Sequence, residues 1–142
     1  MSNNMKVSVK VSEKEFYKKT TKEIEKIARQ VIAYGLNATR NTAVESILQG
    51  SKSGETYQKY NPRRTHTASA SGEAPASDTG FLANNIITRT EPNGLSGEVV
   101  SQAEYSEYLE FGTGTMGARP FMHPALEQNR PKILARLRKL MG

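Results

Sequence analysis

A long stretch without aliphatic side chains sets the first limit on how this chain folds. Residues 50–80 contain no Val, Ile, Leu, Phe or Met, and Tyr57 and Tyr60 are their only large apolar side chains. Such a segment buries too little apolar surface to offset the conformational entropy that ordering removes. A structureless loop of this length in a small domain is either disordered or functional. Because regular patterns resume after it, we expect one domain over residues 1–142, from which residues 50–80 extend as an arm.

Before the arm, the pattern predicts a strand and then a long helix. Polar and apolar residues alternate as in a half-buried strand, with the apolar positions at Val7, Val9 and Val11. Ser12 and Glu15 have capping-box spacing, and no proline interrupts residues 12–49, so one helix should end near Gly50. About 36 helical residues would span roughly 54 Å, whereas a compact chain of this length is only about 37 Å across. We therefore expect the helix either to bend near Gly35 or to project and bury its apolar stripe against a partner.

After the arm, the pattern predicts a small antiparallel sheet and a second helix. A turn or short helix leads into a strand at Phe81, Leu82, Ile86 and Ile87. A Pro-Asn-Gly turn follows, so a second strand is expected around residues 96–100. The last helix is expected from Pro124 to about Met141, and Pro131 predicts a kink or a late start. One side of this helix would carry Leu126, Ile133, Leu134, Leu137 and Leu140.

These elements predict an α+β fold: a long N-terminal helix, a small antiparallel sheet and a C-terminal helix, with the arm between the first helix and the sheet. No apolar run approaches the roughly 20 residues that a membrane-spanning helix needs. The N-terminal residues lack the apolar core of a signal peptide, which predicts a soluble intracellular protein.

The residue types argue against an enzyme, a metal site and a bound cofactor. The chain has no Cys, which excludes disulfides, thiolate zinc sites and cysteine nucleophiles, and His66 and His123 are far apart in sequence. Residues 112–117, GTGTMG, match the glycine pattern of dinucleotide-binding loops. Only 25 residues follow Gly117, and Pro120 comes three residues later, so the rest of a dinucleotide fold does not fit. A tight or flexible loop is the better interpretation, and neither a nucleophile elbow nor a P-loop is present.

The charge is unevenly placed along the chain. The net charge is +6, and residues 81–118 carry −4 whereas residues 119–142 carry +5. Within the acidic segment, Glu104, Glu107 and Glu110 recur at three-residue steps and can share one helix face. Such a row is either a solvated face or an electrostatic contact with a partner.

Nucleic-acid binding is the alternative function that the basic residues leave open. Arg63 and Arg64 lie beside Tyr57 and Tyr60 in the arm, and basic residues among aromatic ones can hold phosphates and stacked bases. The last helix adds further basic side chains, at Arg130, Lys132, Arg136, Arg138 and Lys139. The other interpretation of these residues is the solvated face of an amphipathic helix.

Two blocks of the sequence resemble the head–tail connector and tail-completion family of long-tailed bacteriophages. They are SASGEAPASDTGFLANNI, residues 69–86, and EYSEYLEFGTGTMGARPFMHPALEQN, residues 104–129. In the first block, Ser71 stands where the family often has proline, and the family pattern falls on Gly72, Pro75, Thr79, Gly80 and Leu82. In the second block the pattern falls on Tyr105, Tyr108, Glu110, Phe111, Gly112, Thr113, Arg119, Pro120, Phe121, Pro124 and Ala125. With the long first helix, the likeness extends over residues 12–141.

The resemblance implies a non-enzymatic structural protein of the virion, without a cofactor, that is assembled in the host cytoplasm. Proteins of this family join the tail to the filled head as a ring around the DNA channel. The implied partners are further copies of the chain, neighbouring head–tail connector, tail terminator or tail tube proteins, and channel DNA through non-specific contact.

The resemblance also indicates where the ring contacts would lie. We expect the glutamate row of one copy to meet the basic last helix of its neighbour, since charge complementarity can fix the register of a ring. The expected interface comprises Glu104, Tyr105, Glu107, Tyr108, Glu110, Phe111, Gly112, Thr113, Arg119, Pro120, Phe121, Arg136, Arg138 and Lys139. The arm is expected to order on a partner through Tyr57, Tyr60, Arg63 and Arg64. Phe111 and Phe121 are expected to anchor the glycine loop by packing.

Overall fold

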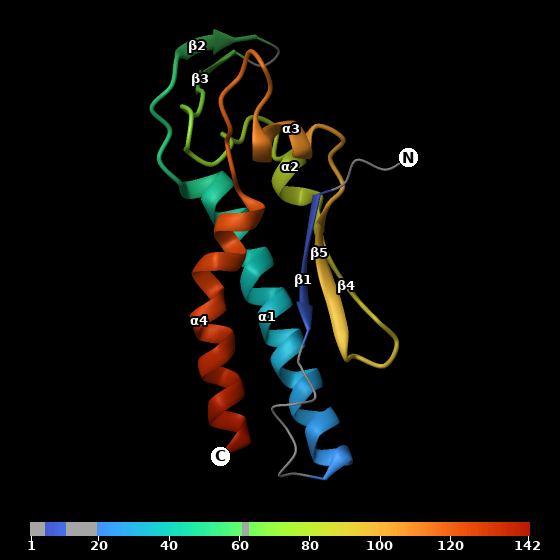
Figure 1. Ribbon diagram of the computed structural model, residues 1–142. Coiled ribbons are helices and arrows are strands. Elements are labelled where there is room, and N and C mark those ends of the chain that lie inside the picture. The colour runs from blue at the N-terminus through green and yellow to red at the C-terminus, as the bar shows by residue number, and fades with distance from the viewer. Residues whose placement is uncertain (1–4, 11–19, 61–62) are drawn as a thin grey trace.

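The computed structural model describes residues 5–10, 20–60 and 63–142, and it confirms the predicted α+β class (Figure 1). Two long helices, α1 and α4, lie side by side, and a three-stranded sheet packs on α1. The arm and the two short helices α2 and α3 lie together at one end of the molecule. The elements are β1 (Met5–Lys10), α1 (Thr21–Gln49), β2 (Thr56–Lys59), β3 (Arg64–Thr67), α2 (Phe81–Asn84), β4 (Ile86–Thr90), β5 (Ser96–Ser101), α3 (Ser106–Phe111) and α4 (Met122–Met141).

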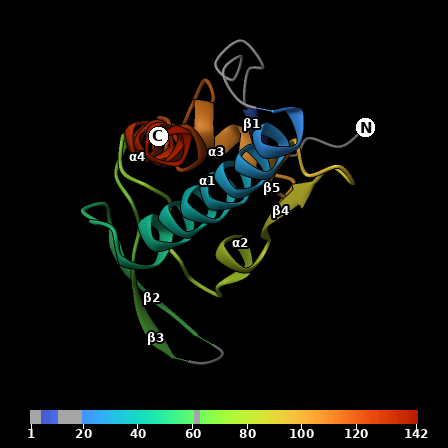
Figure 2. The ribbon, with the colours of Figure 1, turned by 90° about the horizontal axis from the view of Figure 1, so that it is seen from below.

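Helix α1 begins after Thr20, whose hydroxyl accepts the backbone N–H of Glu23 at 3.3 Å, and it ends at Gly50 as predicted. The helix continues through Gly35, which is buried against α4. A Cβ at that position would lie 3.0 Å from Ile133 Cδ1, so the glycine lets the two helices approach closely. Most of the apolar stripe of α1 is covered within the chain, by α4 on one side and the sheet on the other (Figure 2), whereas Leu48 at its end is 53% exposed. The capping box expected at Ser12 and Glu15 lies outside the described residues.

The sheet has the order β1-β5-β4, and all its pairs are antiparallel. Val7 lies opposite Val99, and Ile87 lies opposite Val100. The strand predicted near the N-terminus and the β-hairpin predicted after Phe81 are therefore confirmed, while Val11 lies outside the described residues. The central strand β5 is the most deeply buried, which fits its position between two partners.

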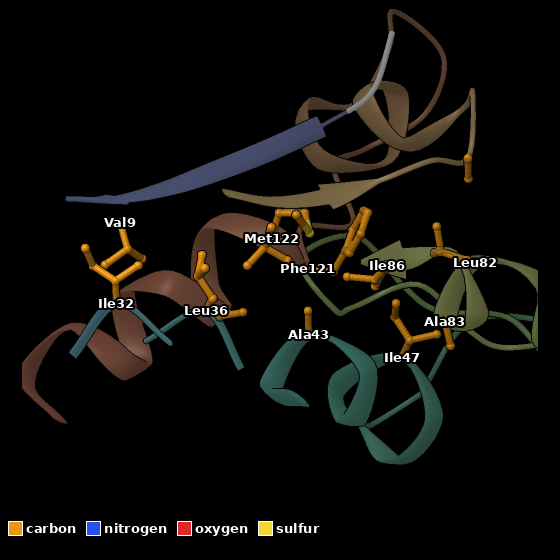
Figure 3. Packing of buried hydrophobic residues seen from close by; sticks show 13 residues of the cluster. Val9, Ile32, Leu36, Ala43, Ile47, Leu82, Ala83, Ile86, Phe121 and Met122 are labelled. Atoms are coloured by element: carbon orange, nitrogen blue, oxygen red, sulfur yellow. The ribbon is translucent and has the colours of Figure 1, made fainter. Parts of the chain in front are cut away.

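The core lies where α1, the sheet and the beginning of α4 meet (Figure 3). Its largest side chain, that of Phe121, is 1% exposed. The aliphatic residues around it include Ile32, Leu36, Ile47, Ile86, Val99 and Met122. A second cluster, built around Val31 and Leu137, joins the two helices.

Helix α4 corrects two sequence-based expectations. It begins at Met122 and continues through Pro131 to Met141, so the late start expected from Pro131 is wrong. Leu134, which was expected on the apolar side, is 40% exposed. The buried side of the helix passes through Ile133 and Leu137 instead, and these two residues pack against α1.

Candidate interaction surface at the arm, the glycine loop and helix α3

The arm contains regular structure that its amino-acid pattern does not predict. Strands β2 and β3 form an antiparallel hairpin, in which Tyr57 lies opposite His66 and their rings meet edge to face at 5.4 Å. Tyr57 and Tyr60 are both exposed. Arg63 Nε donates to Gln58 Oε1 at 3.3 Å. The predicted docking residues of the arm thus lie on or beside one hairpin.

A single carboxylate, that of Asp78, ties this hairpin to the segment before α2. It accepts hydrogen bonds from Lys59 Nζ and from Arg64, whose Nη2 lies 2.8 Å from Asp78 Oδ1. His66 Nδ1 lies 3.8 Å from the same oxygen. Hydrogen bonds from Lys59 and then Arg64 lower the pKa of Asp78 below its usual value. Ion pairs and backbone bonds, rather than apolar burial, therefore order the hairpin.

Two further side chains connect the ends of the arm. Glu73 accepts the backbone N–H of Ser53 at 2.9 Å and of Ala70 at 3.1 Å, and the hydroxyl and amide of Ser53, with the Ala70 amide, lower the pKa of Glu73. Lys52 Nζ donates to the carbonyl oxygens of Ser46 and Ala74, at 3.0 and 2.9 Å. Burial lowers the pKa of Lys52. These bonds hold residues 68–76 against the C-terminal end of α1.

The glycine loop, residues 112–120, is a tight turn, which is one of the two forms that its sequence predicts. Gly112 has φ of 77°, and Thr113 donates its backbone N–H to Met116 O at 2.8 Å. Arg119 joins this loop to the arm, since its Nε and Nη2 donate to Ser69 Oγ and O, each at 3.2 Å. The Arg119 guanidinium, predicted to contact a neighbouring copy, is therefore largely engaged within the chain.

The carboxylate of Glu110 lies beneath the glycine loop and is 4% exposed. It accepts the backbone N–H groups of Phe121, Met122 and His123, at 3.1, 2.8 and 3.2 Å. These are the donors at the N-terminus of α4, where a bound phosphate would have to sit, so Glu110 occupies the position that a nucleotide would need. The expectation that Glu110 shares an exposed face with Glu104 and Glu107 is wrong.

Helix geometry explains this correction. Successive helical residues turn by about 100°, so each three-residue step falls about 60° short of a full turn. Glu107 and Glu110, which both lie in α3, are one such step apart, and that step takes the row from the exposed to the buried side of the helix. Glu104 and Glu107 remain exposed, whereas Ser106, Leu109 and Glu110 face inward.

Four aromatic side chains on and beside α3 are exposed, and we refer to them together as the aromatic surface: Phe81, Tyr105, Tyr108 and Phe111. The rings of Phe81 and Tyr105 lie 6.3 Å apart. Phe111 is 68% exposed, so the expectation that it anchors the glycine loop by packing is wrong, whereas the same expectation for Phe121 is confirmed. Partial burial of Tyr105 raises the pKa of its hydroxyl group. Phe81 was not among the predicted site residues, because its spacing indicates only the start of a short helix.

A groove of about 360 Å³ runs between the arm and the aromatic surface. Its walls come from the arm, from α2 and α3, and from the glycine loop, and they include Ser69, Asp78, Phe81, Tyr105, Met116 and Arg119. The groove is open to solvent and carries both apolar and charged groups.

The basic end of α4 lies at the opposite end of the molecule from α3 (Figure 1). Arg136 stacks on the ring of Tyr34, with Cζ 4.3 Å from the ring centroid, and so packs against α1. Arg138 and Lys139 are exposed, and neither has an ion-pair partner in the part of the chain that the structure describes.

Residues 5–10, 20–60 and 63–142 contain no cluster of three or more His, Cys, Asp or Glu side chains that could hold a metal ion. His66 lies in the arm and His123 at the start of α4, beside Glu127. Over the same residues, no helix has the length and hydropathy to cross a bilayer.

The comparison with known families gives one match. Residues 10–112 match the family described as "Bacteriophage HK97-gp10, putative tail-component". The matched region includes α1, the arm, β4, β5 and α3, and it ends at the beginning of the glycine loop. No curated protein and no solved structure matches the chain. Since the match spans well over half of the sequence, the chain belongs to the HK97-gp10-like family of bacteriophage tail components.

Proposed function

We propose that this tail component joins the tail to the head in the virion, as a homo-oligomeric ring around the DNA channel. The proposal rests on one observation: this member of a tail-component family carries exposed acidic residues at one end and exposed basic residues at the other. Glu104 and Glu107 lie exposed at one end of the molecule, and Arg138 and Lys139 lie exposed at the other. Two complementary surfaces at opposite ends favour head-to-tail contacts between copies, and such contacts close into a ring when the rotation permits.

The proposed role is structural, without catalysis or a cofactor. The ring would form in the host cytoplasm and then lie in the neck of the virion, against head–tail connector, tail terminator or tail tube proteins. The open groove beside the arm, with its mixed polar and apolar walls, supports contact with such protein partners.

Two of the basic residues that could serve nucleic-acid binding already have partners within the chain. Arg64 is paired with Asp78, and Arg136 is stacked on Tyr34, so both guanidinium groups already have partners that a phosphate would have to replace. A nucleic-acid-binding protein of this kind would show an affinity for short duplexes that falls steeply with salt concentration.

The test is electron microscopy of lysates from a phage that carries a stop codon in this gene. We expect filled heads beside separate tails. Tails of abnormal length would assign the protein to tail termination instead, and normal infectious particles would refute a role in joining.

A further inference from the structure

We infer that the aromatic surface of one copy binds the C-terminal end of α4 of a second copy. This inference rests on the proposed function, because a ring requires a head-to-tail contact between neighbouring copies. It goes further by assigning the contact to particular side chains on both copies.

The aromatic surface has the composition of a binding site. Aromatic residues are enriched at the centre of protein interfaces, and here four of them are exposed on and beside one short helix. Glu104 and Glu107 are exposed next to Tyr105 and Tyr108 in the sequence, and neither carboxylate has an ion-pair partner among the described residues. The surface therefore combines apolar area with unpaired negative charge.

The end of α4 offers the complementary chemistry. Leu134 is the exposed aliphatic side chain of this helix, and Arg138 lies one turn further on, on the same face. Leu134, Leu137, Arg138 and Met141 line a shallow hollow of about 410 Å³. A guanidinium group can stack on an aromatic ring and pair with a carboxylate at the same time, while Leu134 supplies apolar contact. Lys139 adds a second positive charge beside them.

The contact must be made between copies. In Figure 1, α3 and the C-terminus lie at opposite ends of the molecule, with the length of α4 between them. A chain therefore cannot bring its own two surfaces together. Because the surfaces differ, a head-to-tail pair retains one free surface of each kind, so assembly continues beyond a dimer unless the two copies bind each other reciprocally.

Cross-linking tests the contact directly, since the chain contains no cysteine. We expect the double variant F111C/L134C, treated with a short bismaleimide in completed particles, to give a ladder of dimers, trimers and larger species. The single variants F111C and L134C should give no ladder beyond a dimer. The pair F111C/R89C, with the second cysteine on exposed Arg89 in β4, is the matched control and should also give none. Absence of the ladder for F111C/L134C would overturn the inference.

Charge reversal tests the pairing itself. The variants E104K/E107K and R138E/K139E should each lose the ladder in the F111C/L134C background, and the chain that carries all four reversals should regain it. E45K/E91K makes the same charge change at exposed residues outside both surfaces and should keep the ladder. An unchanged ladder in both reversed variants, or no recovery in the fourfold variant, would refute the charge pairing.

The two proposals fail in different ways. If the stop-codon phage leaves heads and tails unjoined while F111C/L134C gives no ladder, the joining role stands and this interface is wrong. If the ladder forms and the stop-codon phage is normal, the interface stands and the joining role is wrong.

Discussion

The carboxylate of Glu110 accepts the backbone N–H of Met122 at 2.8 Å, and this bond joins the last turn of α3 to the first turn of α4. The same carboxylate also accepts the N–H groups of Phe121 and His123. One side chain thus satisfies donors that a helix start leaves without partners, and it does so beside the largest residue of the core. The glycine loop between the two helices is closed by this contact.

We expect E110A to lower the free energy of unfolding by about 1–3 kcal/mol, because buried backbone donors lose their acceptor. E110Q keeps one acceptor oxygen and should lose less. The measurement is urea unfolding followed by circular dichroism. E107A, which removes an exposed carboxylate from the same helix, should unfold like the wild type. An unchanged midpoint for E110A would show that water replaces the cap.

The two phenylalanines beside the glycine loop should respond in opposite ways to truncation. F121A should cost about 3–5 kcal/mol of stability, because Phe121 is 1% exposed and its loss leaves a cavity. F111A should leave thermal unfolding of the monomer nearly unchanged, since Phe111 is 68% exposed. Equal melting temperatures for F121A and the wild type would contradict the packing described here.

The sequence pattern correctly predicts the residues whose position depends on local periodicity. Val7 and Val9 alternate with polar neighbours and lie in β1, and the Pro-Asn-Gly turn does connect two antiparallel strands. The end of α1 at Gly50 was also predicted, because glycine ends helices readily. Such signals act within a few residues, so one sequence is enough to interpret them.

The residues that patterns placed wrongly depend on contacts between distant segments. The arm hairpin is ordered by Asp78, which lies 14 residues beyond Arg64 in the sequence. A hydropathy pattern cannot predict an ion pair between such distant residues. Phe111 and Phe121 both border the glycine loop, and only the path of that loop decides which of them enters the core. Likewise, the drift of a three-residue row around α3 decides that Glu110 is buried while Glu107 is exposed.

Two glycines of the same loop should differ sharply on substitution. Gly112 has φ of 77° and ψ of 179°, a region open almost only to glycine, and a Cβ there would lie 2.8 Å from Met116 O and 2.9 Å from Ala118 N. We expect G112A to cost about 1–3 kcal/mol. G114A should be close to neutral, because a Cβ at Gly114 meets nothing within 4 Å. Thermal unfolding of the pair checks this, and equal losses would argue against strain at Gly112.

The arm is the expected site of first cleavage when the free protein meets a protease. Its hairpin rests on side-chain ion pairs at the surface, which contribute little each, and such segments open more readily than a packed core. D78N should therefore speed trypsin cleavage after Lys59 and Arg64, which lose their shared carboxylate. E55Q, a change to an exposed arm carboxylate, is the control and should leave the cleavage rate unchanged. Uniform resistance along the wild-type chain would count against an easily opened arm.

Asp78 should also make the hairpin sensitive to acid. Its hydrogen bonds to Lys59 and Arg64 lower its pKa in the folded state, so the carboxylate stabilises the fold at pH values above the unfolded pKa, about 3.9. This contribution is lost as the pH falls through the lower folded pKa, where Asp78 takes up a proton. The wild type should therefore melt at a higher temperature than D78N at pH 6, and the difference should shrink steadily below about pH 4. Circular dichroism melting curves of both proteins from pH 6 to about pH 2.5 provide the measurement. A difference that stays constant over this range would mean that Asp78 acts through something other than its charge.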